Sequence, residues 1–193
     1  QFQECLKLAS KDPASEVSDA SLWAQKKGGY LARACHGVAL ATDFKFDLAV
    51  PILTEAATMA QEKGDPRAAR FWAQAGNAAI AAGQPDVAVD ALAKALASKS
   101  LNNAERADSE VDRARALVAL GKSAEGEAAL EKGLEIAKRR DEHLVVVNAS
   151  AGGGQTDPSA VDGDAAERVQ VILKNSGLNA EFRQLVRGKS AVD

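Results

Sequence analysis

The sequence predicts a mainly α-helical protein, built as a solenoid of three to four helix hairpins and followed by a short βαβ-like appendage. Hydrophobic residues make up 46% of the 193 residues, but aromatic residues make up only 4%. Alanine supplies most of the difference, and it is the strongest helix former, whereas strands favour β-branched and aromatic side chains. A recurring pattern of small residues and leucine then predicts that the helices stack in pairs.

Net charge and hydropathy argue against nucleic-acid binding and against a membrane-spanning segment. The chain has 24 Lys and Arg residues against 27 Asp and Glu residues, a net charge of −3, so we expect no nucleic-acid partner. No apolar run approaches the roughly 20 residues that a helix needs to span a bilayer, so we expect no transmembrane segment.

The chain begins at Gln1 instead of Met, which we interpret as loss of an upstream segment, a secretory signal being one candidate.

The first 29 residues predict a helix pair that caps one end of the solenoid. A helix over residues 2–9 ends before Asp12-Pro13, and a second helix over residues 14–26 ends at Gly28-Gly29. Solenoids need atypical end units because one face of the end unit meets water.

Three units of about 38 residues follow, each predicted to be a helix, a short turn and a second helix. The first helix of each unit carries a small residue, namely Gly37, Gly76 or Ala114. Sixteen positions later, on the second helix, stands a leucine, namely Leu53, Leu92 or Leu130. We expect the small residues to let the two helices cross closely, and the leucine to fill the gap to the next unit.

Turn signals separate the predicted helices. Within the units they are Gly83-Gln84-Pro85-Asp86 and Gly121-Lys122-Ser123, and between the units Gly64-Asp65-Pro66 and Ser100-Leu101-Asn102-Asn103. Proline suits the first position of a helix, because the N–H that it lacks has no partner there.

Residues 30–140 resemble the tetratricopeptide repeat (TPR) family. The second unit matches its motif best, with Trp72, Gly76, Gly83, Ala88, Leu92 and Ala95 at the motif positions. The first and third units keep the small residues and the leucine but have Arg33 and Glu110 in place of the tryptophan. The unit is longer than the family's usual 34 residues, which implies helices extended by about one turn.

The resemblance implies a groove, lined by the first helix of each unit, that holds a peptide or helix of another protein. Counted from the motif positions, the groove residues are Arg70, Ala73, Asn77, Asp108, Val111, Asp112 and Arg115. The alternative is that these side chains are simply exposed.

The two cysteines, Cys5 and Cys35, lie on the first and third predicted helices, which are neighbours in a stack of hairpins. A disulfide between them implies an oxidising compartment, and together with the missing upstream segment it favours the periplasm or cell envelope over the cytoplasm. The alternative is two buried free thiols. No group of His and Cys residues has the spacing of a metal site, and we expect no metal, no cofactor and no catalytic residue.

Residues 142–193 differ in character from the rest of the chain. They predict a strand over residues 143–148, a Gly-rich loop, a helix over residues 164–176 and a second strand over residues 180–186. The loop offers a candidate phosphate site formed by Asn148, Ser150, Gly152, Gly153 and Gly154. A flexible linker is the alternative, and we expect this appendage to be weakly ordered or to belong to a truncated second domain.

Residues 142–188 also resemble the start of a diacylglycerol kinase catalytic domain. Asn148, Ser150 and Gly152 match its first motif, in which Ala149 replaces the usual proline. The nucleotide motif of that family, G-G-D-G-T, does not occur in the chain. We therefore expect a non-enzymatic protein-interaction scaffold, the alternative being an inactive N-terminal fragment of a lipid kinase fused to a TPR module.

Overall fold

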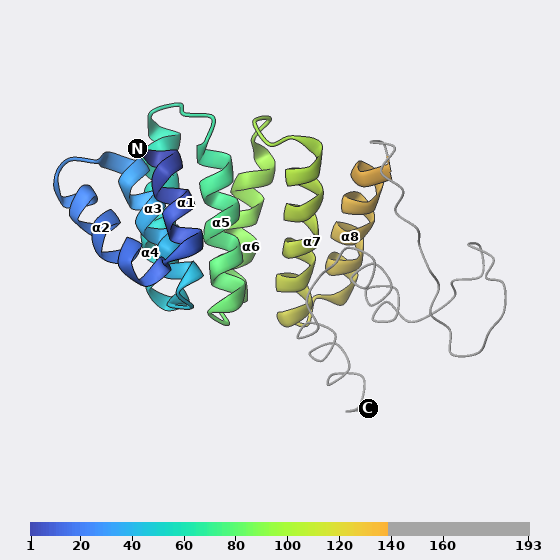
Figure 1. Ribbon diagram of the computed structural model, residues 1–193. Coiled ribbons are helices and arrows are strands. Elements are labelled where there is room, and N and C mark those ends of the chain that lie inside the picture. The colour runs from blue at the N-terminus through green and yellow to red at the C-terminus, as the bar shows by residue number, and fades with distance from the viewer. Residues whose placement is uncertain (139–193) are drawn as a thin grey trace.

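The structure is a computed structural model that describes residues 1–138, and within this range it contains eight α-helices and no strand (Figure 1). The helices are α1 (Phe2–Lys11), α2 (Pro13–Gln25), α3 (Gly29–Thr42), α4 (Phe46–Glu62), α5 (Ala68–Ala81), α6 (Pro85–Ala97), α7 (Asn103–Ala119) and α8 (Ser123–Lys138). The helical solenoid is therefore confirmed for these residues. The predicted strands, the Gly-rich loop and the kinase-like segment lie outside them.

The helices form four successive hairpins, α1–α2, α3–α4, α5–α6 and α7–α8, arranged side by side (Figure 1). Each helix packs on the next one in the chain, and the first helices of adjacent hairpins also touch, α1 on α3, α3 on α5 and α5 on α7. Because each hairpin contacts mainly its neighbours, the fold is a one-dimensional stack with the first helices along one face.

The recurring glycines lie where the two helices of a hairpin cross. A Cβ atom added to Gly37 would lie 2.6 Å from Leu53 Cγ, and one added to Gly76 would lie 2.5 Å from Leu92 Cγ. Each leucine therefore covers the glycine of its own hairpin, and Leu53 also borders the space next to α5 of the following hairpin. That the leucine fills the gap to the next unit stays a prediction. The glycine leaves a depression on the first helix, and the leucine directly opposite fills it.

The core consists largely of alanine. Its largest fully buried side chains include four leucines, Leu53, Leu92, Leu117 and Leu130. Trp72 is 5% exposed, donates from Nε1 to Gln61 Oε1 at 2.7 Å, and has Lys94 Nζ 4.4 Å from its ring centre. Small side chains let the helices approach closely, and the few large ones fill the spaces that remain.

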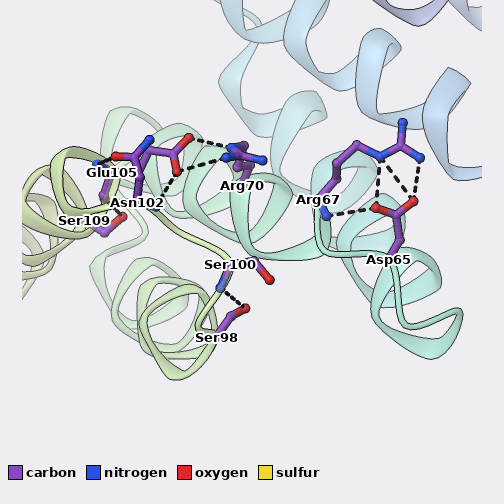
Figure 2. Close-up of polar contacts among 8 residues, drawn as sticks. All are labelled: Asp65, Arg67, Arg70, Ser98, Ser100, Asn102, Glu105 and Ser109. Carbon is purple, nitrogen blue, oxygen red and sulfur yellow. Dashed lines mark hydrogen bonds and ion pairs between the residues drawn. The ribbon is translucent and has the colours of Figure 1, made fainter.

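The helix ends follow the local signals of the sequence. The Asp12 carboxylate accepts a hydrogen bond from the Ser15 N–H at 3.2 Å, and Pro13 takes the first position of α2. At the start of α7, Asn102 and Glu105 form a reciprocal capping box with bonds of 2.9 and 3.0 Å (Figure 2). No helix within residues 1–138 is both long and apolar enough to cross a membrane.

Candidate functional site

The candidate site is the face formed by α3, α5 and α7, where the predicted groove residues lie on α5 and α7. Arg70 of α5 pairs with Glu105 of α7, and its Nη2 donates to Glu105 Oε2 at 3.2 Å (Figure 2). The hydrogen bonds from Arg70 hold the pKa of Glu105 below its ordinary value. This pair links two hairpins, so the charge of Arg70 is already matched within the chain.

A second polar group lies about two turns further along the same two helices. Asp112 is buried, and its carboxylate accepts hydrogen bonds from Arg115 Nη1 at 3.0 Å and from the Asn77 side chain. Burial raises the pKa of Asp112, and the two donors oppose that shift. The charges of Arg115 and Asp112 therefore balance each other, and the hydrogen bond from Asn77 connects this pair to α5.

The remaining predicted groove residues differ in exposure. Val111 is buried, Ala73 is half-buried against the core, and Asp108 is exposed. Among the seven residues, the exposed ones are Arg70, Asn77 and Asp108. The groove positions counted from the motif thus include residues that pack between the helices as well as residues on the surface.

A hollow of about 270 Å³ opens between α3, α4 and α5. Its lining is mostly apolar and consists of Val38, Ala41, Thr42, Phe46, Leu53, Gln74, Asn77 and Ala78. The Gln74 side-chain oxygen is shielded from solvent and has no hydrogen-bond partner among the described residues. Of the predicted groove residues, Asn77 alone lines this hollow.

An exposed apolar patch adjoins the hollow at the turn between α3 and α4. Phe44 is 82% exposed and contacts the ring of Phe46 edge-on, with ring centres 6.1 Å apart. Leu48 is 58% exposed on the first turn of α4. Since Phe46 also lines the hollow, the Phe44–Phe46 ring pair borders it.

Phe44 has a left-handed backbone, with φ of +59°. The equivalent turns after α5 and α7 have Gly83 at +70° and Gly121 at +77°. A side chain in this conformation is strained, whereas glycine adopts it freely. The protein therefore carries a bulky aromatic residue, exposed and strained, where the repeat calls for glycine.

A separate buried cluster joins the first three helices. Cys5 of α1 and Cys35 of α3 form a disulfide, with their Cα atoms 6.2 Å apart. Glu16 of α2 is 6% exposed, and its Oε1 lies 3.8 Å from Cys35 Sγ. Burial, and to a smaller extent the charge of Asp19, raises the pKa of Glu16.

Another polar cluster fixes the turn between α4 and α5. The Asp65 carboxylate accepts from the Tyr30 hydroxyl at 2.6 Å and from Arg67 N and Nε at 2.8 and 2.9 Å, and Figure 2 shows the Arg67 contacts. The hydrogen bonds from Arg67 hold the pKa of Asp65 well below its usual range. All three groups are satisfied by one another, so this cluster positions the hairpins instead of offering a site.

Sequence reasoning missed Glu16, Gln74 and Phe44. Alignment of the units places Phe44 at the position of Gly83 and Gly121, so the sequence could have identified Phe44 as an unusual residue at this turn. No sequence pattern marks Glu16 or Gln74, because they stand out only as polar side chains that are shielded from solvent in the folded protein. The candidate phosphate residues Asn148, Ser150, Gly152, Gly153 and Gly154 lie outside the described residues.

No model of a known protein family matches the chain. Its fold is similar to crystal structures of the TPR-like repeats of a kinesin light chain from Podosopora anserina. One has a TM-score of 0.62 at 17% identity, covering 98% of this chain and 93% of that one. The other has a TM-score of 0.61 at 16% identity, covering 100% and 97%. The TPR-like fold is therefore shown.

A curated relative, a universal stress protein of Mycolicibacterium smegmatis, is 40% identical over 72 residues. The match covers 36% of this chain and 55% of the relative. The chain thus spans about half the length of the curated protein that it matches.

Proposed function

We propose that the protein is a non-enzymatic scaffold that holds a peptide or helix of another protein against the face formed by α3, α5 and α7. The observation that carries this proposal is the hollow between α3, α4 and α5, together with the apolar patch at its edge. Scaffolds with the same TPR-like fold typically present such faces to protein partners.

The charges on this face favour an apolar anchor over a highly charged ligand. Arg70 pairs with Glu105, and Arg115 pairs with Asp112, so neither arginine is available without breaking an internal pair. The hollow is large enough for one or two apolar side chains, and a donor group on the partner would satisfy the Gln74 oxygen. We therefore propose that the partner inserts an apolar side chain beside a backbone or side-chain N–H.

The test is selection of peptides from a random library on the full chain, followed by titration of the selected peptides. Thr42 lines the hollow, and Thr58 is its matched control, because both are exposed and both hydroxyls donate to the carbonyl four residues earlier at 2.9 Å. Thr42→Arg should weaken binding at least about tenfold, a loss of about 1.4 kcal/mol, and Thr58→Arg should leave it within about twofold. Equal binding by the two variants would remove the hollow as the site.

We also propose that the protein acts in the periplasm or cell envelope, because a disulfide persists in an oxidising compartment. Blocking free thiols in intact cells before lysis, followed by a gel-shift of the chain, tests this proposal. An unmodified chain supports the envelope, and a chain modified at both cysteines assigns it to the cytoplasm. ATP-dependent lipid phosphorylation by the full chain would contradict the non-enzymatic assignment.

A further inference from the structure

The cluster of Cys5, Glu16 and Cys35 has an arrangement that a structural disulfide does not require. The three ligand atoms come from three different helices, and all lie within 4.8 Å of one another. All three residues are buried. The Glu16 carboxylate faces Cys35 Sγ, with Oε1 3.8 Å from the sulfur.

A disulfide sulfur carries no proton, so it cannot donate a hydrogen bond to Glu16. The Glu16 carboxylate is more than nine-tenths buried beside such a sulfur, and burying it there lowers the free energy of unfolding. Ala20, Phe2 and Trp23 pack around the two cysteines, and the charge of Asp19, which acts on Glu16, is also negative and cannot balance it. The carboxylate would gain a strong partner if the sulfurs were separated by a cation.

The spacing fits a zinc ion. Zinc binds thiolate sulfur at about 2.3 Å and carboxylate oxygen at about 2.0–2.2 Å in tetrahedral geometry, which sets sulfur–sulfur and sulfur–oxygen separations of about 3.6–3.8 Å. The Glu16 Oε1 to Cys35 Sγ distance is 3.8 Å. The Cα atoms of the cysteines are 6.2 Å apart, so a small change of the side-chain torsions opens the sulfurs to the required separation.

The geometry points to a zinc site formed by Cys5, Glu16 and Cys35 when the disulfide is reduced, with water at the fourth position. A dithiol reductant supplies two electrons and two protons to the disulfide and is itself oxidised to a disulfide, which leaves two thiols on the chain. Zinc then displaces both thiol protons to solvent and binds the two thiolates and the Glu16 carboxylate. The two states exclude each other, so the first three helices are joined either by the disulfide or by the metal.

The site can be reached because α1 is a short helix that packs on α2 and α3. It is ten residues long and fully buries only Cys5 and Ala9, so local opening of α1 exposes the sulfurs without unfolding the other hairpins.

The test uses the full chain and zinc chloride alone. The chain is reduced with a dithiol under anaerobic conditions, freed of the reductant and dialysed against zinc, and the bound metal is measured by mass spectrometry. We expect one zinc per reduced chain and none on the disulfide form. Zinc should also raise the melting temperature of the reduced chain, and bound cobalt should show the absorption bands of a tetrahedral thiolate site. Equal metal content in the two redox forms would overturn the proposal.

Variants separate this site from binding elsewhere. Glu16→Gln keeps the side-chain shape and both thiols but removes the ligand charge, and it should weaken zinc binding at least about tenfold. His36→Gln is the control, because His36 follows Cys35 directly but is not among the clustered ligand atoms. It should bind zinc as wild type does. Unchanged affinity in Glu16→Gln, retention of zinc by Cys5→Ser, or an equal loss in His36→Gln would each refute the proposed ligand set.

Discussion

Arg70 of α5 and Glu105 of α7 form a two-point ion pair that joins successive hairpins, and the same carboxylate accepts a hydrogen bond from the Asn102 N–H at the start of α7. One side chain therefore both caps a helix and fixes the neighbouring hairpin. Because both partners of the ion pair are partly exposed, its contribution to stability is small, and the cap adds a separate one.

Two substitutions of Glu105 separate these roles. Glu105→Gln keeps a side chain that can complete the capping box but loses the charge, so it should lower the free energy of unfolding by about 0.2–1 kcal/mol. Glu105→Ala loses both interactions and should cost about 1–2 kcal/mol. Urea unfolding of the two variants is the measurement, and equal losses would contradict the dual role.

Phe44→Gly should stabilise the protein. The backbone φ of +59° strains phenylalanine by about 1–2 kcal/mol, and the exposed ring loses little more than its contact with Phe46 on removal. We expect a net gain of about 0.5–1 kcal/mol in thermal or urea unfolding. Phe44→Ala removes the ring without relieving the strain and should give no gain, so equal effects of the two variants would count against strain at this turn.

The contact of Gly76 with Leu92 should behave as a coupled pair. A methyl group on residue 76 would overlap the leucine, so Gly76→Ala should cost about 1–3 kcal/mol, and Leu92→Ala should cost about 2–5 kcal/mol by leaving a cavity. Together, Gly76→Ala and Leu92→Ala should cost less than the sum of their separate effects, because the new methyl group occupies space that the leucine vacates. Additive losses in urea unfolding would show that the two side chains do not share one packing site.

Low pH should remove the contribution of Asp65 to the free energy of unfolding. Its pKa is depressed in the folded protein, chiefly by the hydrogen bonds from Arg67, so the stabilisation is present above the unfolded pKa of about 4 and is lost as pH falls through the folded value. Asp65→Asn should therefore lower the free energy of unfolding by about 1–3 kcal/mol at pH 7. The difference from wild type should shrink steadily below pH 4. A difference that is constant between pH 7 and pH 2.5 would exclude this linkage.

The Cys5–Cys35 disulfide should leave no titratable thiol in the unreduced, denatured chain, and reduction should release two. The bond closes a loop with a sequence separation of 30 residues, so reduction should lower the free energy of unfolding by about 3–4 kcal/mol. Thiol titration and urea unfolding measure the two effects. Two thiols in the unreduced chain would leave Cys5 and Cys35 as free side chains and remove the basis for an oxidising compartment.

The sequence alone determined the helical hairpins, because their causes are local or periodic. Alanine sets the helix preference, Pro13 and Pro85 mark helix starts, and Gly83 marks a turn, and each effect acts within a few residues. The repeat of Gly37 and Gly76 likewise identified the face on which the second helix of each hairpin packs. The actual partner of Leu53 required the crossing geometry of two helices, which no spacing rule supplied.

The tertiary structure decided which polar groups are available and which are already satisfied. Arg70 and Arg115 have the spacing of groove residues, yet both are held by acidic side chains from α7. Glu16 meets the two sulfurs because α2 packs on both α1 and α3. Burial and contact between distant segments depend on how whole helices pack, and a linear pattern of residue types does not specify that arrangement.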